Sequence, residues 1–158
     1  MRTGIGYDIH PLVIGRPLVL GGVTVPFEKG LDGWSDADVL THAVMDALLG
    51  AAALGDIGLH FPPGDAAFQG ASSLAMLERV RGLLEEKGCT ASNIDATVIA
   101  ERPRLREFID AMRASLAGAL QVDLDRVSVK ASTSNGIGAL AAGAGIAALA
   151  VAVIEERS

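Results

Sequence analysis

Residues 147–154 read Ala-Ala-Leu-Ala-Val-Ala-Val-Ile, and this short stretch carries the strongest signal for the fold. Large side chains at positions 149, 151 and 153 alternate with alanines at positions 148, 150 and 152. A period of two is typical of a β-strand, because successive side chains point to opposite faces of a sheet. The alanine face would let another layer approach closely, so the pattern predicts a buried strand covered by a helix or by a second subunit.

The charge-free segment around this strand has a second interpretation. No charged residue occurs from Ala131 to Ile154, and a helix over the last 18 of these residues would be about 27 Å long, close to the thickness of a bilayer core. Eight of those 18 residues are alanine and three are glycine, so the segment is only weakly apolar. We therefore favour a buried strand over a membrane span, and we expect homo-oligomerisation to cover the apolar surface.

Length and composition limit the possible classes of protein. A chain of 158 residues suits one domain over 1–158, because single cores stop growing only beyond roughly 250 residues. With 50% hydrophobic and 20% charged residues, the chain is too apolar for intrinsic disorder. A net charge of −6 argues against a nucleic-acid partner, which requires a basic face on the protein.

Cysteine content and the first residues bear on the cellular compartment. Cys89 is the only cysteine, which excludes an intrachain disulfide and a zinc site built from several thiolates. Disulfide-free chains are usual in reducing compartments. The opening MRTGIGYDIH lacks the basic start and the apolar segment of a secretory signal. These features predict a cytoplasmic protein with no membrane partner.

Periodicity predicts interleaved strands and helices. The expected strands cover 4–9, 17–25, 94–100, 126–130 and the stretch from 147, and the expected helices cover 35–55, 72–87 and 106–120. This alternation favours a two-layer α/β sandwich, with one mixed β-sheet and helices on one face. The other face of the sheet would then pack against sister subunits.

Local signals set the expected ends of these elements. Ser35 is the expected N-cap of the first helix, with Asp38 completing a weak capping box and Gly55 ending the helix. Gly15 is expected to turn the chain between the first two strands. The Gly-Gly pair at 21–22 is expected to form a β-bulge.

Three residues form a candidate metal site. Asp8 and His10 are two apart on an expected strand, so both side chains leave the same face about 6.6 Å apart. His42 could complete the set if the first helix packs beside that strand. One carboxylate and two imidazoles suit Zn²⁺ or a similar divalent ion and leave one coordination position open. The alternative is that Asp-x-His arises by chance and that His42 is an ordinary hydrogen-bonded helix residue.

Longer motifs surround this triad. The segments GIGYDIH, LVLGGVTVPFEKGL, GWSDADVLTHAVMDALLGAAALGDIG, FPPGD, IDATVIAERPRL and VSVKASTSNGIG follow one another along essentially the whole chain. They resemble the signature of the 2-C-methyl-D-erythritol 2,4-cyclodiphosphate synthases of the non-mevalonate isoprenoid pathway. The resemblance is highly specific, because the longest segment matches nearly residue for residue.

The resemblance implies a homotrimeric lyase with active sites at subunit interfaces. In that family 4-diphosphocytidyl-2-C-methyl-D-erythritol 2-phosphate cyclises to 2-C-methyl-D-erythritol 2,4-cyclodiphosphate with release of CMP. Asp8, His10 and His42 would hold Zn²⁺ or a similar ion, and Mg²⁺ or Mn²⁺ would bridge the substrate diphosphate. Catalytic roles would fall to Trp34, Ser35 and Thr133. Substrate contacts would come from Asp56, Ile57, Gly58, Phe61, Asp65, Ala100, Pro103, Arg104, Leu105, Arg106, Ala131, Ser132 and Asn135.

Phosphate chemistry fits this residue set. A phosphate monoester has a second pKa of about 6, so the attacking group is already mostly dianionic at neutral pH and requires no protein base. The protein must position the two phosphates and neutralise their charge. The available cations are Arg102, Arg104, Arg106 and Lys130, together with the amide-rich start of the first helix.

Several positions depart from the family pattern. Trp34 stands where histidine is common, Pro63 where an acid is common, and Asn135 where an acidic residue normally helps to hold magnesium. We therefore expect weaker Mg²⁺ binding. Alanines at 139, 142 and 144 replace an aromatic residue, an arginine and a glutamate that line an axial cavity in the family, so isoprenoid diphosphates should bind weakly. Two alternatives remain open, a trimeric metal-stabilised binding protein with reduced catalysis and a zinc-dependent nucleotide-diphosphate hydrolase.

Overall fold

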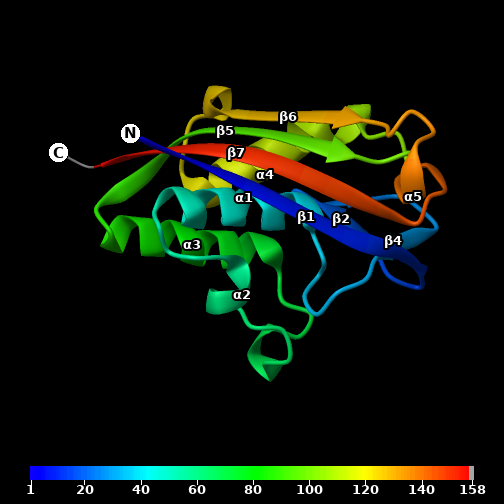
Figure 1. The fold of residues 1–158 in the computed structure, drawn as a ribbon, viewed down its shortest axis with the longest axis horizontal. Helices are drawn as coiled ribbons and strands as arrows, with labels where there is room; N and C mark the ends of the chain where they lie inside the picture. Colours follow the sequence, from blue (N-terminus) through cyan, green and yellow to red (C-terminus); the bar gives the residue numbers. More distant parts are fainter. Residues whose placement is uncertain (157–158) are drawn as a thin grey trace.

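The fold is a five-stranded mixed sheet covered by helices on one face. The computed structural model describes residues 1–156, and the strands of the sheet lie in the order β4-β1-β7-β5-β6 (Figure 1). Only β5 and β6 run parallel, whereas the other neighbours are antiparallel. The strands are β1 (Arg2–Ile14), β4 (Lys29–Leu31), β5 (Cys89–Ile99), β6 (Val127–Ser132) and β7 (Gly145–Glu156).

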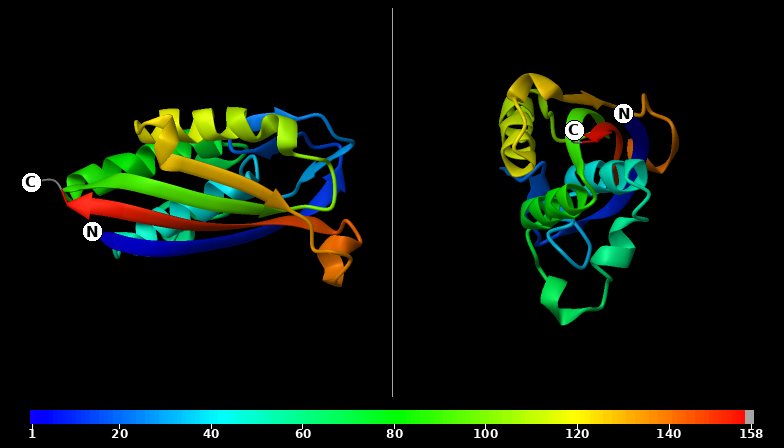
Figure 2. Two further views of the ribbon diagram at one scale, coloured as in Figure 1. Left: turned by 90° about the horizontal axis from the view of Figure 1, so that it is seen from above. Right: turned by 90° about the vertical axis from the view of Figure 1, so that its left-hand side faces the viewer.

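Three long helices form the second layer. Figure 2 shows them on the same side of the sheet, which confirms the expected arrangement of layers. They are α1 (Val39–Ala51), α3 (Ser73–Glu86) and α4 (Ile109–Leu120). The shorter elements are the hairpin of β2 (Leu18–Leu20) and β3 (Val23–Val25), the helices α2 (Ile57–His60) and α5 (Gly138–Ala141), and 3₁₀ turns at Ala66–Phe68, Arg106–Phe108 and Leu124–Arg126. No helix among residues 1–156 is long and apolar enough to cross a bilayer.

Helix α1 packs unusually close to the centre of the sheet. A Cβ atom on Gly4 or Gly6 of β1 would overlap the backbone carbonyl oxygens of Ala47 or Ala43 on α1. The alanines of β7 at 148, 150 and 152 are buried beneath the same helix layer. The expectation that the small-residue face of the last strand allows a close approach is therefore confirmed.

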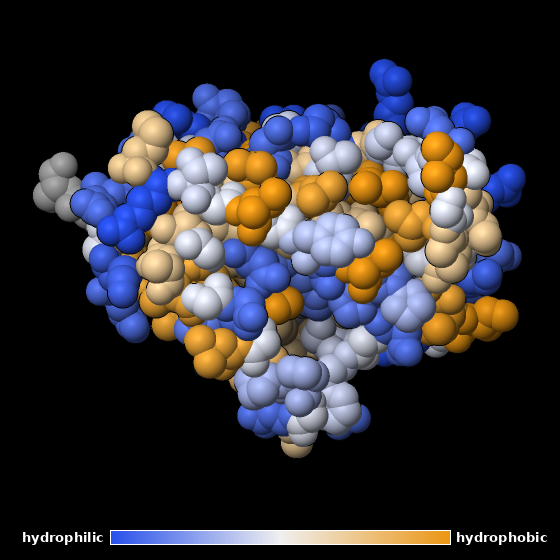
Figure 3. Space-filling view, in the orientation of Figure 1, coloured by the Kyte–Doolittle hydropathy of each residue, from blue (hydrophilic) through white to orange (hydrophobic). Residues whose placement is uncertain are grey.

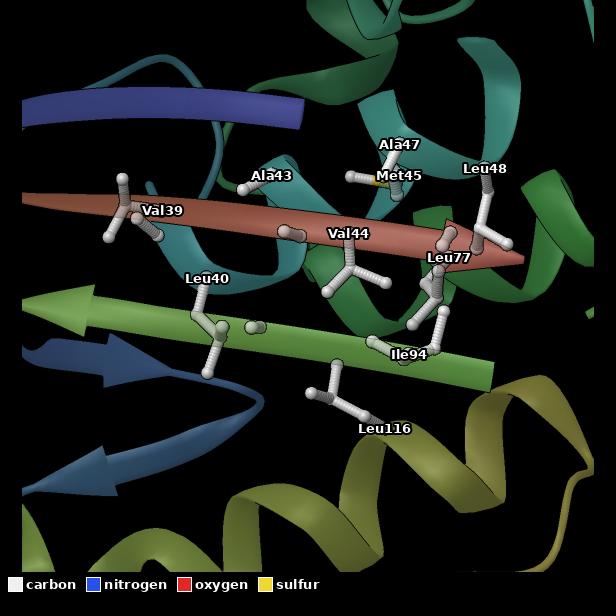
Figure 4. Close-up of a cluster of buried hydrophobic side chains, with 14 of the residues drawn as sticks. Val39, Leu40, Ala43, Val44, Met45, Ala47, Leu48, Leu77, Ile94 and Leu116 are labelled. Carbon is white, nitrogen blue, oxygen red and sulfur yellow. The ribbon is translucent and has the colours of Figure 1, made fainter. Parts of the chain in front are cut away.

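Large aliphatic side chains from all three long helices and from the sheet fill the space between the layers. Val39, Leu40 and Val44 of α1 lie over β7 and β5, as Figure 4 shows. Leu77 of α3 and Leu116 of α4 complete the same cluster, and both are fully buried. This core holds α1 against the sheet, and α1 in turn carries His42.

The opposite face of the sheet is apolar and uncovered in the single chain. Ile5, Tyr7 and Ile9 of β1 and Leu149 and Val151 of β7 are exposed, with Ile5 at 71% of its surface. Figure 3 shows orange hydrophobic side chains over the strands on the face turned toward the viewer. The prediction that this face lacks cover within one chain is confirmed.

The expected start and end of the first helix were wrong. The N-cap is Asp38, whose carboxylate accepts the Thr41 backbone N–H at 3.0 Å, and the helix ends at Ala51 rather than at Gly55. The Asp38 carboxylate also accepts the backbone N–H groups of Gly21 and Gly22. Those tertiary bonds favour Asp38 as the cap, because one buried carboxylate satisfies donors from two segments.

The region 17–25 also differs from its expectation. It forms two short strands rather than one, and the Gly21–Gly22 pair is the turn between them rather than a bulge. Both glycines have positive φ, at 57° and 72°, as a tight two-residue hairpin turn requires. The predicted helix 106–120 begins with a 3₁₀ turn before α4. The helix over 72–87 is confirmed as α3, with Ser72 as its N-cap.

Candidate active site

Asp8, His10 and His42 converge on one point. The Asp8 Oδ2 atom lies 2.9 Å from His10 Nε2 and 2.9 Å from His42 Nδ1. One ligand atom from each residue lies within 4.8 Å of the other two, a spacing compatible with a single bound cation. The alternative of a chance Asp-x-His with an unrelated helix histidine does not fit this geometry.

Each ligand is positioned by its element. Asp8 and His10 leave the helix-covered side of β1, because the side chains of a strand alternate and Asp8 pairs with the buried Ala148 of β7. His42 lies in the first turn of α1 and is only 5% exposed. The close approach of α1 to β1 brings its imidazole to the carboxylate, so the glycines of β1 are part of the site's construction.

The ring of His10 is oriented by the main chain. Its Nδ1 lies 2.6 Å from the backbone carbonyl oxygen of Asp32. A carbonyl only accepts hydrogen bonds, so Nδ1 carries the proton and the neutral ring turns its Nε2 lone pair toward Asp8. A lone pair that faces a carboxylate oxygen is repulsive unless a proton or a cation lies between them. The arrangement is therefore suited to hold a positive ion.

Burial and charge act in opposite directions on these groups. Burial by itself would raise the pKa of Asp8, but its hydrogen bonds with the His10 and His42 rings, and the favourable charge interaction when those rings are protonated, outweigh burial. The pKa of Asp8 therefore lies well below the usual carboxyl range. Burial would lower the pKa of His10, but Asp8 outweighs burial and the pKa is raised. Asp8 is thus an ionised ligand at neutral pH.

A cavity of about 240 Å³ opens above the triad. We call it the triad pocket. Its walls include five residues that the sequence analysis assigned to the site, namely Trp34, Ser35, Ile57, Gly58 and Phe61. Pro63, Phe68 and Met76 also line it. The cavity is below the range of roughly 300–1,000 Å³ that small-molecule sites usually occupy, so a nucleotide-sized ligand would extend beyond it.

The indole N–H of Trp34 is already engaged. Its Nε1 donates to the backbone carbonyl of Asp65 at 2.8 Å, and the Trp34 carbonyl accepts the Gly70 N–H at 2.8 Å. Trp34 thus holds both ends of the segment 65–70 by hydrogen bonds, beside the triad pocket. Asp65 does not line the pocket itself, and its carboxylate accepts the Ala67 N–H.

The turn at 56–58 is held by two carboxylates. Asp56 caps α2 by accepting the Leu59 N–H at 3.0 Å, and Asp46 accepts the Ile57 N–H at 2.8 Å. Burial is the main cause that raises the pKa of Asp46, and the nearby negative charge of Asp56 raises it further. Asp46 is a site residue that the sequence pattern did not predict, although its position four residues after His42 places it on the same face of α1.

Arg16 is a second residue that sequence reasoning missed. Its guanidinium donates to the backbone carbonyls of Gly33 and Ser35, each at 2.7 Å, and to the Asp32 carboxylate. It therefore holds the loop before α1, whose Asp32 carbonyl orients His10. No periodic signal marks a turn arginine that acts on a loop distant in sequence.

A second cavity lies at the far edge of the sheet. We call it the edge pocket, and its volume is about 270 Å³. It is lined by Ala100, Glu101, Pro103, Arg104, Leu105, Arg106, Ala131, Ser132 and Thr133. It brings together seven of the substrate-contact residues that the resemblance implied, namely Ala100, Pro103, Arg104, Leu105, Arg106, Ala131 and Ser132, with the implied catalytic residue Thr133. Asn135 lies just outside the lining, where its backbone N–H and its side-chain oxygen both bond the Thr133 hydroxyl.

The two pockets do not meet within one chain. Asp8 pairs with Ala148, Ala148 with Val98 and Val98 with Ala131. These paired residues form a row across β1, β7, β5 and β6, and three interstrand steps along it separate Asp8 from Ala131 by about 14 Å. Ala148 and Val98 are fully buried under the helices, so no groove joins the two pockets along this row.

The remaining predicted cations and the third histidine have ordinary partners. Lys130 pairs with Asp95 across neighbouring strands, away from both pockets. Arg102 lines a separate cavity with Lys29 and Glu28. His60, the third histidine of the chain, places Nε2 2.8 Å from the Leu54 carbonyl oxygen. Only Arg104 and Arg106 of the predicted cations line the edge pocket.

Comparison with known proteins agrees with this geometry. The model of the YgbB family matches residues 1–155. The 2-C-methyl-D-erythritol 2,4-cyclodiphosphate synthase of Dehalococcoides mccartyi is 59% identical over 99% of this chain and its own full length. The synthase of the same name from Alkaliphilus oremlandii is 55% identical over 98% of both chains.

Solved structures give the same result. A 2C-methyl-D-erythritol-2,4-cyclodiphosphate synthase with CDP bound superposes with a TM-score of 0.89 at 35% identity, over 98% of this chain and all of that one. IspF of Plasmodium falciparum in complex with CDP superposes with a TM-score of 0.87 at 28% identity, over 99% and 97% of the two chains. The chain therefore belongs to the YgbB family, whose matched members here are 2-C-methyl-D-erythritol 2,4-cyclodiphosphate synthases.

Proposed function

We propose that this protein is a cyclodiphosphate synthase, a lyase that converts 4-diphosphocytidyl-2-C-methyl-D-erythritol 2-phosphate to 2-C-methyl-D-erythritol 2,4-cyclodiphosphate and CMP. The observation that carries the proposal is the triad of Asp8, His10 and His42, which faces a pocket in a chain of this family. The full-length identity to synthases of that name supports the substrate.

The donor set of the triad suits Zn²⁺ or a similar divalent ion. One carboxylate and two imidazoles are present, and their separations fit a single cation with one position left for a ligand oxygen. When bound, such an ion would supply Lewis-acid activation of a substrate phosphate oxygen. Asn135 would offer only a neutral amide oxygen toward Mg²⁺ or Mn²⁺, so weaker binding of that second ion remains our prediction.

The chain's own residues would act by holding the substrate in a reactive pose. Ser35 and the 56–58 turn line or border the triad pocket, where they would hold the phosphate and methylerythritol ends. Thr133 and the arginines at 104 and 106 line the edge pocket, where they would hold the cytidine end and its phosphates. When the reacting groups are well oriented, an intramolecular attack can reach an effective molarity on the order of 10⁵ M or more.

The two pockets would work together only across a subunit interface. The triad pocket is too small for the whole substrate and the buried core separates it from the edge pocket. The exposed apolar face of β1 and β7 offers a surface for that assembly. We propose a homotrimer in which the triad pocket of one subunit faces the edge pocket of its neighbour. A cytoplasmic location, from the lone buried Cys89, stays a prediction.

Phosphorus NMR of the reaction mixture tests the function. We expect the two coupled signals of a cyclic diphosphate together with CMP. A hydrolase would instead give CMP and the open 2,4-bisphosphate, whose two phosphate signals show no coupling to each other. Substrate that binds without turnover would indicate a binding protein. His42→Ala should lower kcat by at least about 10³-fold, because the third cation ligand is lost. His60→Ala is the control. Within the described part of the chain the His60 ring hydrogen-bonds the Leu54 carbonyl and no triad residue, so turnover should persist.

A further inference from the structure

Ser73 contacts the outer nitrogen of a triad histidine. It is the first residue of α3 and is fully buried, and its Oγ lies 2.9 Å from His42 Nε2. We propose that Ser73 and Asp36 act as a positioning pair that holds the His42 ring with its Nδ1 lone pair directed at the cation site. The proposal rests on the proposed function, because it presupposes that a cation binds the triad.

Counting protons fixes the direction of the hydrogen bonds. A serine hydroxyl has one proton, and the Ser73 hydroxyl donates it to the Asp36 carboxylate, which only accepts. Ser73 Oγ is then left as an acceptor toward His42, so Nε2 must carry the ring proton. The neutral ring therefore presents an unprotonated Nδ1 to Asp8 Oδ2 at 2.9 Å. This is the tautomer that a metal ligand requires.

Asp36 is itself held rigidly by backbone groups. Its carboxylate accepts the Ser73 N–H at 2.9 Å and the Asp38 N–H at 3.2 Å, and its own N–H donates to the Ala71 carbonyl at 3.0 Å. The pair thus ties the loop before α1 to the start of α3. A carboxylate fixed in this way cannot turn away from the Ser73 hydroxyl.

Ser35 does not replace this contact. Its Oγ lies 3.3 Å from the same His42 nitrogen, a longer separation than that of Ser73, and it also accepts the Ala37 N–H at 3.2 Å. Ser35 borders the pocket, whereas Ser73 sits behind the ring. His10 and His42 are therefore oriented by different means, one by a main-chain carbonyl and the other by a side-chain pair that mutation can remove.

Metal affinity measured by chelator competition tests the positioning pair. We expect Ser73→Ala in the full-length protein to weaken Zn²⁺ binding about 10- to 100-fold and to change the visible absorption of the Co²⁺-substituted protein. Ser72→Ala is the matched control. It removes the N-cap of the same helix, whose Oγ accepts the Ala75 N–H, but no contact to His42, so its Zn²⁺ affinity should match the wild type. Asp36→Asn keeps the size of the side chain and should weaken binding by at least several-fold.

The outcomes separate this inference from the proposed function. If the wild type binds no Zn²⁺, the metal site fails and the inference fails with it. If the wild type binds Zn²⁺ and Ser73→Ala binds it within twofold with an unchanged Co²⁺ spectrum, only the inference is overturned. Equal losses in Ser72→Ala and Ser73→Ala would also overturn it, because the effect would then come from the helix start. Should Ser73→Ala fail to fold, Asp36→Asn decides alone, and affinity within twofold of the wild type overturns the inference.

Discussion

The triad pocket and the edge pocket differ in how completely one chain builds them. In the triad pocket the outer nitrogens of His10 and His42 both have partners within 2.9 Å, and His42 is nearly fully buried. In the edge pocket Thr133 is exposed, and its hydroxyl bonds Asn135 alone among residues 1–156, at 3.2–3.3 Å. A rigid cation site needs fixed geometry before the ligand arrives, whereas the edge pocket, in the homotrimer that we propose, would gain its second wall from a neighbouring subunit.

Mixing two inactive variants gives the largest effect that this difference predicts. His42→Ala damages only the triad pocket and Thr133→Ala only the edge pocket. If each site draws one pocket from each of two neighbouring subunits, an equimolar mixture after subunit exchange should recover activity in about a quarter of the sites. The measurement is the turnover of CMP formation before and after exchange. No recovery, with mixed oligomers verified by native mass spectrometry, would place both pockets of a site in one subunit.

Gly6→Val tests whether the close packing of α1 builds the triad pocket. The new side chain would overlap the carbonyl of Ala43, and such overpacking costs about 1–3 kcal/mol of unfolding free energy. We expect a lower Tm together with weaker Zn²⁺ binding, because α1 must shift and it carries His42. Gly82→Val, on α3 with open space around the position, is a control that should leave Zn²⁺ binding intact. Unchanged Zn²⁺ affinity in Gly6→Val would show that the cation site does not depend on the close packing of α1 against β1.

Trp34→Phe tests whether Trp34 acts in the triad pocket by holding the segment 65–70. The change removes the indole N–H that holds the Asp65 carbonyl, a hydrogen bond worth about 0.5–1.5 kcal/mol. We expect KM to rise a few-fold with little change in kcat, because the segment 65–70 loosens while the cation ligands stay in place. Steady-state kinetics separate the two constants, and a fall in kcat at constant KM would argue for direct contact with the reacting phosphates.

The smallest effect concerns the exposed ion pair between Lys130 and Asp95, which lines neither pocket. The hydrogen bond from Lys130 lowers the pKa of Asp95, so its stabilisation is present above the ordinary carboxyl pKa and is lost as pH falls through the lowered value. Both side chains are about half exposed, which limits the contribution to below about 1 kcal/mol. Urea unfolding from pH 6 to pH 3 should show a slightly shallower loss for Lys130→Ala. A steeper loss of unfolding free energy in the variant would contradict the conclusion that Lys130 lowers the pKa of Asp95.

Much of the fold followed from local pattern. The alternation at 147–154 predicted β7, and the stripe between Ser72 and Gly88 predicted α3, because side-chain period and capping groups act within a few residues. The same period placed Asp8 and His10 on one face of β1. The residue types also suggested His42 as a possible third ligand, and the resemblance of the motifs to one family implied that role together with the substrate contacts.

The sequence by itself thus determined the side-chain periods, the start of α3 and the chemical types of the ligands. Tertiary structure decided the cap at Asp38, whose carboxylate is shared with the hairpin glycines, and the support of the site by Asp46 and Ser73. It also decided that the triad pocket lies at β1 and the edge pocket at the ends of β5 and β6, since strand order is not encoded in any local period. The physical reason is that caps and periods are short-range, whereas hydrogen bonds between distant segments form only when the packed core brings them together.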